Sequence, residues 1–180
     1  MRRDNNKAIA MELSVFVQQQ NLDAVRKKIN QDNVSTLWYN TSLLQSVISC
    51  DTQQRNEKAY LLIDLGVNVN HQNDKGATAL HDCAASACID IAKYILKHGG
   101  EASLSLSDQY GNQPLWTATY NATLQGASES ENSLMRLFCE HGADVHHQNH
   151  ARKSPMDLAI EVNDQGLIDI LNENNEHGVS

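Results

Sequence analysis

Residues 74 to 99 read DKGATALHDCAASACIDIAKYILKHG, and this stretch carries the signals for two short helices. Thr78 can cap a helix N-terminus through its hydroxyl, and Gly99 can take the left-handed conformation that ends a helix. Between them, apolar residues recur at intervals of three and four, which is the spacing of one helical face. These residues are Leu80, Cys83 and Ala84, then Ile91, Ile95 and Leu96. The stretch therefore predicts a helix-turn-helix unit.

The same signals recur along the chain at nearly constant distances. Further start signals are Thr41-Ser42-Leu43-Leu44, Gln113-Pro114-Leu115-Trp116 and Ser154-Pro155-Met156-Asp157, and further stop signals are Gly66 and Gly142. Each closing glycine precedes the next start by 12 to 14 residues. This periodicity is typical of a repeat protein, in which stacked units bury a continuous core and leave one long surface free.

The motifs resemble the ankyrin repeat, a unit of ~33 residues that runs Gly-x-Thr-Pro-Leu-His, two helices, then Gly-Ala-x-Val-Asn. The matching segments are residues 66–70, 76–81 and 142–146. The resemblance covers residues 34–172 and implies an all-α ankyrin-repeat solenoid of about four repeats with an N-terminal helical cap. Only one start motif keeps the family histidine, as His81. The other copies have Leu44, Trp116 and Asp157 at this position, so the hydrogen-bond network that the histidine supports is expected to be partial.

The predicted organisation is a single domain over residues 1–180. It comprises a helical cap at 1–33, repeats at 34–70, 71–106 and 107–146, a fourth repeat or C-terminal cap at 147–172, and a tail at 173–180 that we expect to fray. The starts are 37, 35 and 41 residues apart, so extra residues are expected between the helices of the first and third repeats. In the third repeat they are expected to form a polar loop over residues 123–132.

Composition excludes several classes of protein. The net charge is −8, with +3 over residues 1–30 and −11 over residues 31–180. A stack so acidic repels nucleic acid and favours a basic partner. The sequence predicts neither a membrane span nor a signal peptide, so the expected compartment is the cytoplasm. Four cysteines fit that compartment if they stay reduced, with Cys83 and Cys139 as core residues.

Catalytic and cofactor signatures are weak or missing in the sequence. The stretch around Gly126 lacks the second glycine of a nucleophile elbow, and the glycine at 111 lacks the lysine and spacing of a phosphate-binding loop. His146, His147 and His150 lie close together, but no cysteine or carboxylate completes a ligand set at known spacing. We therefore expect no enzyme, no cofactor and no metal.

The resemblance implies that a partner protein contacts the hairpin tips and the exposed side of each first helix. Large aromatic residues at such positions are typical binding anchors, among which we favour Trp38, Tyr110 and Tyr120. For Trp116, packing against a neighbouring repeat is favoured over contact with a partner. The 123–132 loop, with Glu129 and Glu131, is a second candidate surface for partner binding. The full set is Trp38, Asn40, Ile48, Ser49, Asp74, Lys75, Ala85, Ser86, Gln109, Tyr110, Asn112, Trp116, Tyr120, Asn121, Glu129, Glu131, His150, Lys153, Glu161 and Val162.

Short ankyrin proteins with an acidic surface resemble bacterial immunity proteins, which neutralise a cognate toxin. The expected function is therefore non-catalytic binding that occludes a partner. The expected partner is a basic, nuclease-like toxin domain. We expect the chain itself to be a monomer or to form a 1:1 complex with that partner. The alternative is a regulatory or scaffold ankyrin protein that binds a cellular protein. A metal-binding or enzymatic role through the histidines is the least favoured hypothesis.

Overall fold

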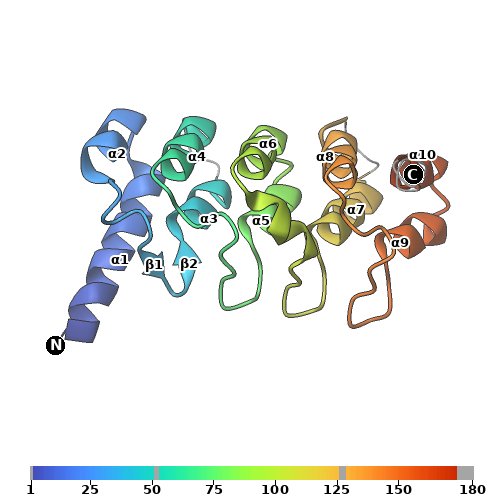
Figure 1. Cartoon of the computed structure of the whole chain (residues 1–180), viewed down its shortest axis with the longest axis horizontal. Coiled ribbons are helices and arrows are strands. Elements are labelled where there is room, and N and C mark those ends of the chain that lie inside the picture. Colours follow the sequence, from blue (N-terminus) through green and yellow to red (C-terminus); the bar gives the residue numbers. More distant parts are fainter. Residues whose placement is uncertain (1, 51–52, 126–128, 174–180) are drawn as a thin grey trace.

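The computed structural model describes residues 2–50, 53–125 and 129–173, although the side chains of residues 2–7, Trp38 and Gln125 lie outside this description. Helix pairs stand side by side in one row, the N-terminal and C-terminal ends of the chain lie at opposite ends of it, and hairpin loops project along one edge (Figure 1). The only strands in the described part are two of two residues each, so the predicted all-α repeat solenoid is confirmed.

The helices follow in order along the row. They are α1 (Arg2–Gln19), α2 (Leu22–Lys28), α3 (Leu43–Ile48), α4 (Arg55–Asp64), α5 (Ala79–Ala85), α6 (Ile89–Lys97), the 3-10 helix η1 (Gly100–Ser105), α7 (Pro114–Gln125), α8 (Glu129–Glu140), α9 (Pro155–Glu161) and α10 (Gln165–Asn172), with strands β1 (Leu37–Trp38) and β2 (Thr41–Ser42) before α3. We call the pairs α3–α4, α5–α6, α7–α8 and α9–α10 the first to fourth repeats.

The predicted proline and glycine signals act as expected. Pro114 and Pro155 are the first residues of α7 and α9, where the missing N–H has no helical partner. Gly66, Gly99 and Gly142 have φ values of +91°, +88° and +81°, in the left-handed region that favours glycine. These glycines follow α4, α6 and α8 and turn the chain toward the next hairpin.

A single apolar core runs through the stack. The first helices α3, α5 and α7 contribute fully buried leucines, and α9 contributes the buried Met156. Each of the second helices α4, α6 and α8 contributes a fully buried residue four positions before its closing glycine. The second set is Leu62, Ile95 and Phe138. Cys83 and Cys139 are buried in the same core, as predicted, and are free thiols. Stability therefore comes from contacts between neighbouring repeats.

A buried hydrogen bond links the second repeat to the third. The Thr78 N–H donates to Nδ1 of His81 at 3.1 Å, which makes Nδ1 the acceptor and leaves Nε2 to donate to the Asn112 carbonyl at 3.0 Å. Burial lowers the pKa of His81, so the ring stays neutral. The bond ties the start of α5 to the residue before the next start.

The predicted register of the first repeat was wrong by one residue. α3 is capped by Ser42, not Thr41, and Gln45 stands where His81 stands in the second repeat. The Gln45 Nε2 donates to the Ala77 carbonyl at 3.0 Å, one residue before Thr78, so it makes the same bond between repeats. The network is thus continued by glutamine in the first repeat and interrupted at Trp116, whose indole Nε1 is buried without a partner among the described residues.

Replacing His81 by alanine is expected to destabilise the protein by about 1 to 2 kcal/mol, because the Asn112 carbonyl loses its buried donor. Replacement by glutamine is expected to cost less, since Gln45 already makes this bond in the first repeat. Urea unfolding of both variants would measure the difference. Equal losses in the two variants would contradict a role for the hydrogen bond.

The expected polar loop over residues 123–132 was also wrong. Residues 123–125 complete α7, and residues 129–132 form the first turn of α8, so only residues 126–128 lie outside the described part. The extra length of the third repeat extends both helices to 12 residues. Glutamate is a good helix former, and in the first turn it also complements the helix dipole.

The helices α1 and α2 lie within residues 1–33, where the sequence predicted a helical cap. α1 packs against α3, and a hydrogen bond of 3.0 Å joins the buried hydroxyls of Ser14 and Ser46. The buried ammonium of Lys58 on α4 donates to the Gln18 carbonyl at 3.4 Å. These contacts fix the first end of the row. The prediction that the C-terminal tail frays concerns residues that lie, apart from Glu173, outside the described part.

Candidate protein-interaction surface

Three of the hairpin tips share one backbone design. In each, an Asn or Asp side chain accepts hydrogen bonds from the N–H groups two and four residues later, while its own N–H bonds to the carbonyl four residues later. The residues are Asn73, Asp108 and Asn149. Each turn closes at a residue with positive φ, namely Gly76, Gly111 and Arg152. Such Asx turns hold the tips in a defined shape.

The first hairpin is built differently. β1 and β2 pair antiparallel with Leu37 opposite Ser42 and Trp38 opposite Thr41. The two residues between the strands, Tyr39 and Asn40, have φ values of +45° and +54°. Positive φ at both central residues is the signature of a type I′ hairpin turn. This turn places Tyr39 at the tip, where its side chain is 70% exposed.

Hydrogen bonds also join each tip to its neighbours. The Gln109 N–H donates to the Lys75 carbonyl at 2.7 Å, and the His150 N–H donates to the Tyr110 carbonyl at 3.0 Å. At the first hairpin, Asn40 donates to the Gln72 carbonyl at 3.2 Å. The tips are therefore held in one preformed row.

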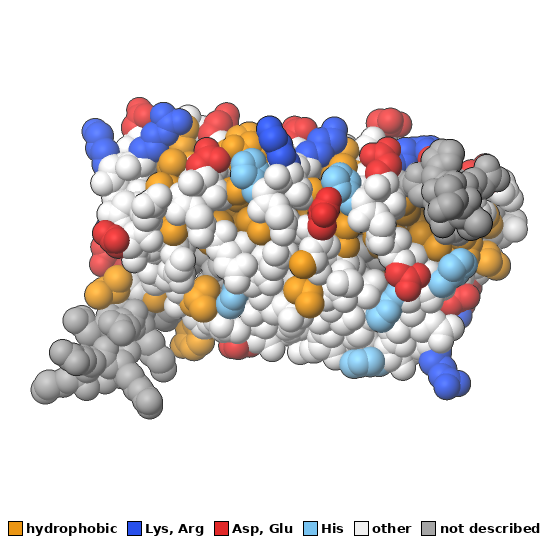
Figure 2. Space-filling view, in the orientation of Figure 1, with side chains coloured by type: hydrophobic (Ala, Val, Ile, Leu, Met, Phe, Trp, Pro, Cys, Tyr) orange, Lys and Arg blue, Asp and Glu red, His pale blue; other side chains and the backbone are white. Residues whose placement is uncertain are grey.

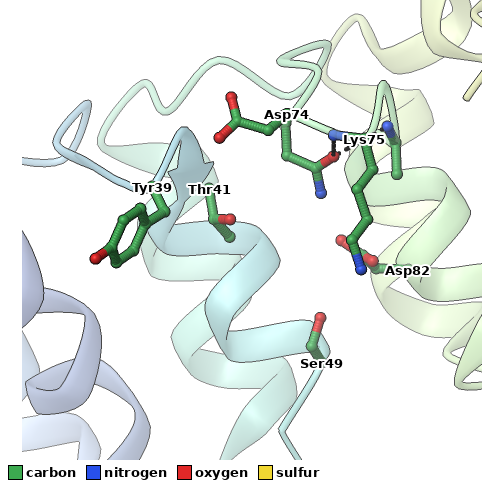
Figure 3. Close-up of a pocket in the computed structure, with 8 residues that line it drawn as sticks. Tyr39, Thr41, Ser49, Asp74, Lys75 and Asp82 are labelled. Carbon is green, nitrogen blue, oxygen red and sulfur yellow. Dashed lines mark hydrogen bonds between the residues drawn. The ribbon is translucent and has the colours of Figure 1, made fainter. Parts of the chain in front are cut away.

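A groove of about 470 Å³ opens between the first and second hairpins and reaches the helices behind them. Its walls come from both hairpins and from the ends of α3 and α5 (Figure 3). The lining residues are Tyr39, Thr41, Ser49, Asn73, Asp74, Lys75, Ala77 and Asp82. Burial raises the pKa of the Asp82 carboxyl to about 7, and a hydrogen bond from Gln45 opposes that rise.

Comparison with known proteins agrees with this geometry. A family model of ankyrin repeats that spans three copies matches residues 47–129. Residues 47–129 thus contain ankyrin repeats.

Two curated ankyrin-like matches are far longer than this chain. The mouse protein named "Protein fem-1 homolog A-like" is 38% identical over 73 residues, which cover 41% of this chain and 11% of that protein. The human "BCL-6 corepressor-like protein 1" is 30% identical over 92 residues, which cover 51% of this chain and 5% of that protein. The similarity thus concerns the repeats and a small part of each relative. Ankyrin repeats are protein-binding modules that use their extended surfaces.

Many of the predicted contact residues are accessible on this ankyrin surface. Tyr110 at the third tip is 62% exposed, and Tyr120 on α7 is 41% exposed. The Lys153 ammonium and the Glu161 carboxylate form an ion pair of 2.9 Å beside the last tip. The other exposed members of the predicted set are Ser49, Asp74, Lys75, Ala85, Gln109, Glu129, His150 and Val162.

Several predicted contacts proved to be internal instead. Ile48 is fully buried, and Glu131 is 7% exposed on the packed side of α8. Asn112 is also buried, and its side-chain oxygen accepts from Asn149 at 2.8 Å. The expectation that these three residues face a partner was wrong. Ile48 belongs to the apolar core, Asn112 is held between two hydrogen-bonded tips, and Glu131 lies among the buried residues of α8. Trp38 has a described backbone, but its side chain lies outside the described part.

Others hold the surface together from partly exposed positions. Asn121 donates to the Ala84 carbonyl at 3.2 Å and so joins α7 to α5, and Asn40 holds the first two tips together. Ser86, at the end of α5, is half-buried. The rings of Trp116 and Tyr120 stack, with centroids 5.1 Å apart and planes 12° apart. Trp116 thereby supports the exposed Tyr120 ring.

The acidic excess is not concentrated at the tips. On the visible face, Asp, Glu, Lys and Arg gather along the edge formed by α2, α4, α6 and α8, and fewer lie over the hairpins (Figure 2). The tips themselves carry Asp74, Lys75, Asp108, Arg152 and Lys153. The net charge can still attract a basic partner at a distance, but contact at the tips involves both signs of charge.

Sequence reasoning missed Asp82, Tyr39 and Thr41 as members of a site. The type I′ turn that exposes Tyr39 lacks the glycine that usually marks it. Asp82 lies in a helix between buried residues, and no local pattern shows that its carboxylate reaches a groove. Among the described residues, no helix is both long and apolar enough to cross a bilayer, and no three His, Cys, Asp or Glu side chains converge as metal ligands would.

Proposed function

We propose that this chain is a non-catalytic module that binds another protein and acts by covering part of its surface. The observation that carries the proposal is the row of hydrogen-bonded hairpin tips with the exposed rings of Tyr110 and Tyr120 beside it. A preformed surface loses little conformational entropy on binding, and exposed aromatic rings on it supply buried area. Such a module needs no reaction of its own to block a partner.

Replacing Tyr110 and Tyr120 together by alanine is expected to weaken partner binding by about 2 kcal/mol, because two aromatic contacts are lost. Crosslinking of the full chain in its native cell, followed by mass spectrometry, identifies the partner, and calorimetry measures both affinities. Lys93→Ala on the outer face of α6 serves as the control. If a folded double variant binds as tightly as wild type, the contact surface lies elsewhere.

The narrower form of the proposal is an immunity protein that neutralises a cognate, basic, nuclease-like bacterial toxin in the cytoplasm as a 1:1 complex. The net charge of −8 supports a basic partner, because opposite charge accelerates association. The test is genetic: the neighbouring reading frame should encode a protein with a toxic C-terminal domain, and this chain should protect cells from it. Cells that survive that toxin equally well without this gene would exclude the immunity role.

The alternative is a regulatory or scaffold protein that binds a cellular protein through the same surface. The similarity to parts of one mouse and one human protein is compatible with this alternative. The identity of the crosslinked partner distinguishes the two forms, since a toxin domain would support the first and a host regulatory protein the second. A metal-binding or enzymatic role has the least support.

A further inference from the structure

The groove between the first two hairpins contains a carboxylate oxygen that the fold does not use. Asp82 projects from α5 to the groove, and its Oδ2 is buried without a hydrogen-bond partner among the described residues. The Gln45 amide hydrogen-bonds to the carboxylate and still leaves Oδ2 unpaired. An unpaired buried acceptor is unfavourable, and more so when it is charged. The Asp82 carboxylate lines the groove, so a donor that displaces the side chains covering Oδ2 would satisfy this acceptor.

The walls of the groove carry two further groups suited to a cation. Asp74 is exposed on the second hairpin, and Figure 3 shows its carboxylate pointing toward the first hairpin. Tyr39 stands on the opposite rim with its ring 70% exposed. The face of an aromatic ring attracts cations electrostatically. One groove thus combines two carboxylates with an aromatic wall.

We propose that this groove receives an arginine side chain of the partner protein, whose guanidinium donates to Asp82 and Asp74 and lies against the Tyr39 ring. This inference rests on the proposed protein-binding function and names the chemistry that one part of the surface recognises. Arginine fits better than lysine because its planar group carries five donors that can meet two separate carboxylates while its face stacks on a ring. The volume of about 470 Å³ lies within the range of about 300–1,000 Å³ of binding clefts.

Lys75 supplies a test with the opposite sign. It also lines the groove, and Figure 3 shows its side chain extending from the second hairpin in the direction of Asp82. The positive charge of Lys75 repels an incoming guanidinium, so the Lys75 side chain must move aside when a guanidinium enters the groove. Loss of the Lys75 charge should therefore strengthen arginine binding, whereas loss of the Asp82 charge should weaken it.

The experiment uses the full ¹⁵N-labelled chain and the peptide acetyl-Gly-Ser-Arg-Ser-Gly-amide, compared with the same peptide containing citrulline, the neutral analogue of arginine. NMR titration is expected to shift the amides of Ser49, Asp74 and Asp82 with the arginine peptide alone. Asp82→Asn should weaken binding about tenfold or more, as expected for loss of a charge-assisted hydrogen bond. Lys75→Gln should tighten it.

Two control variants make the same charge changes away from the groove. Asp90→Asn and Lys93→Gln lie at exposed positions of α6 and should leave the affinity unchanged. Equal binding by Asp82→Asn and wild type, equal binding of the citrulline peptide, or no shifts in the groove at the highest soluble peptide concentration would each overturn the proposal. The unliganded spectrum of each variant verifies that it is folded.

Failure of this inference is distinguishable from failure of the proposed function. If the crosslinked partner binds Asp82→Asn as tightly as wild type, arginine recognition by this groove is wrong and the binding module stands. The opposite outcome is that the arginine peptide binds the groove while no partner from the native cell binds the Tyr110 and Tyr120 double variant more weakly than wild type. In that case the proposed function is wrong and the groove is still an arginine site.

Discussion

Asparagine in place of Asp82 is expected to stabilise the free protein by about 2 to 4 kcal/mol above pH 7 and to leave its stability unchanged near pH 4. Burial raises the pKa of the Asp82 carboxyl from its ordinary value of 3.8 to about 7. Between these values the unfolded chain releases the proton that the folded chain retains. Above both values the folded chain buries an anion, which asparagine avoids.

The sign follows from the raised pKa. The protonated Asp82 carboxyl contributes fully to the free energy of unfolding of the wild type below the unfolded pKa of about 4. This contribution is lost as the pH rises to about 7, because the unfolded state loses its proton at lower pH than the folded state. Other titratable groups lie near this carboxyl: His81 and Cys83 on α5, Asp74 and Lys75 on the second hairpin, and Tyr39 on the first, whereas Gln45 and Ser49 of the α3 segment do not titrate. All of these are present in both proteins, so their difference isolates Asp82.

Urea unfolding of wild type and Asp82→Asn at several pH values between about 4 and about 8 measures this difference. Asp90→Asn, an exposed change of equal charge, should give a difference that varies little with pH. A constant gap between wild type and Asp82→Asn across the range would mean that the carboxyl titrates as it does in the unfolded chain. If Asp82→Asn gains stability in this experiment and loses arginine binding in the peptide titration, Asp82 is a residue that costs folding stability and contributes to binding.

The parts of the fold that the sequence predicts well are those with local causes. Gly99 ends a helix because its own φ is left-handed, and Pro155 starts one because its own N–H is missing. Each of these helix signals involves only residues within one helical turn, so the local sequence is enough to predict it. Repetition of the same signals then indicates stacking, because one such helix pair cannot bury its apolar face alone.

The errors arose where two residues competed or where distant segments decided. Thr41 and Ser42 can both cap a helix, and the reciprocal hydrogen bonds between Ser42 and Gln45 show that Ser42 does so. Gln45 also bonds to the Ala77 carbonyl in the next hairpin, which fixes the register of the repeat. Residues 129–132 are polar, which suits a loop equally well, yet they form the start of α8.

The groove shows the same limit more clearly, since its lining residues come from two repeats. Tyr39 and Asp74 are far apart in sequence, and they line one site only because adjacent hairpins are held together by hydrogen bonds such as that from Asn40. Asp82 also hydrogen-bonds to Gln45 of the preceding repeat. A single sequence gives no signal for contacts of this kind, so the tips were predictable as a surface while the groove between them was not.

Alanine in place of Phe138 is expected to cost about 3 to 5 kcal/mol, because it leaves a cavity where the fully buried ring packs. Phe138 lies in α8, which contacts α6, α7 and α10, so the cavity weakens the third repeat and its junctions with both neighbours. In a stack whose stability is a sum over neighbouring repeats, such a loss should not spread evenly. The third and fourth repeats should unfold at a lower denaturant concentration than the first.

The two tryptophans can report the two ends separately. Trp38 is in the first hairpin and Trp116 is in α7, so Trp38→Phe leaves a reporter in the third repeat and Trp116→Phe leaves one in the first. Combined with Phe138→Ala, the Trp116 fluorescence transition should come at lower urea concentration than the Trp38 transition. Leu62→Ala, at the equivalent position of the first repeat, should reverse that order. Coincident transitions in both variants would show that the stack unfolds as one unit, which would contradict the expected separate unfolding of its two ends.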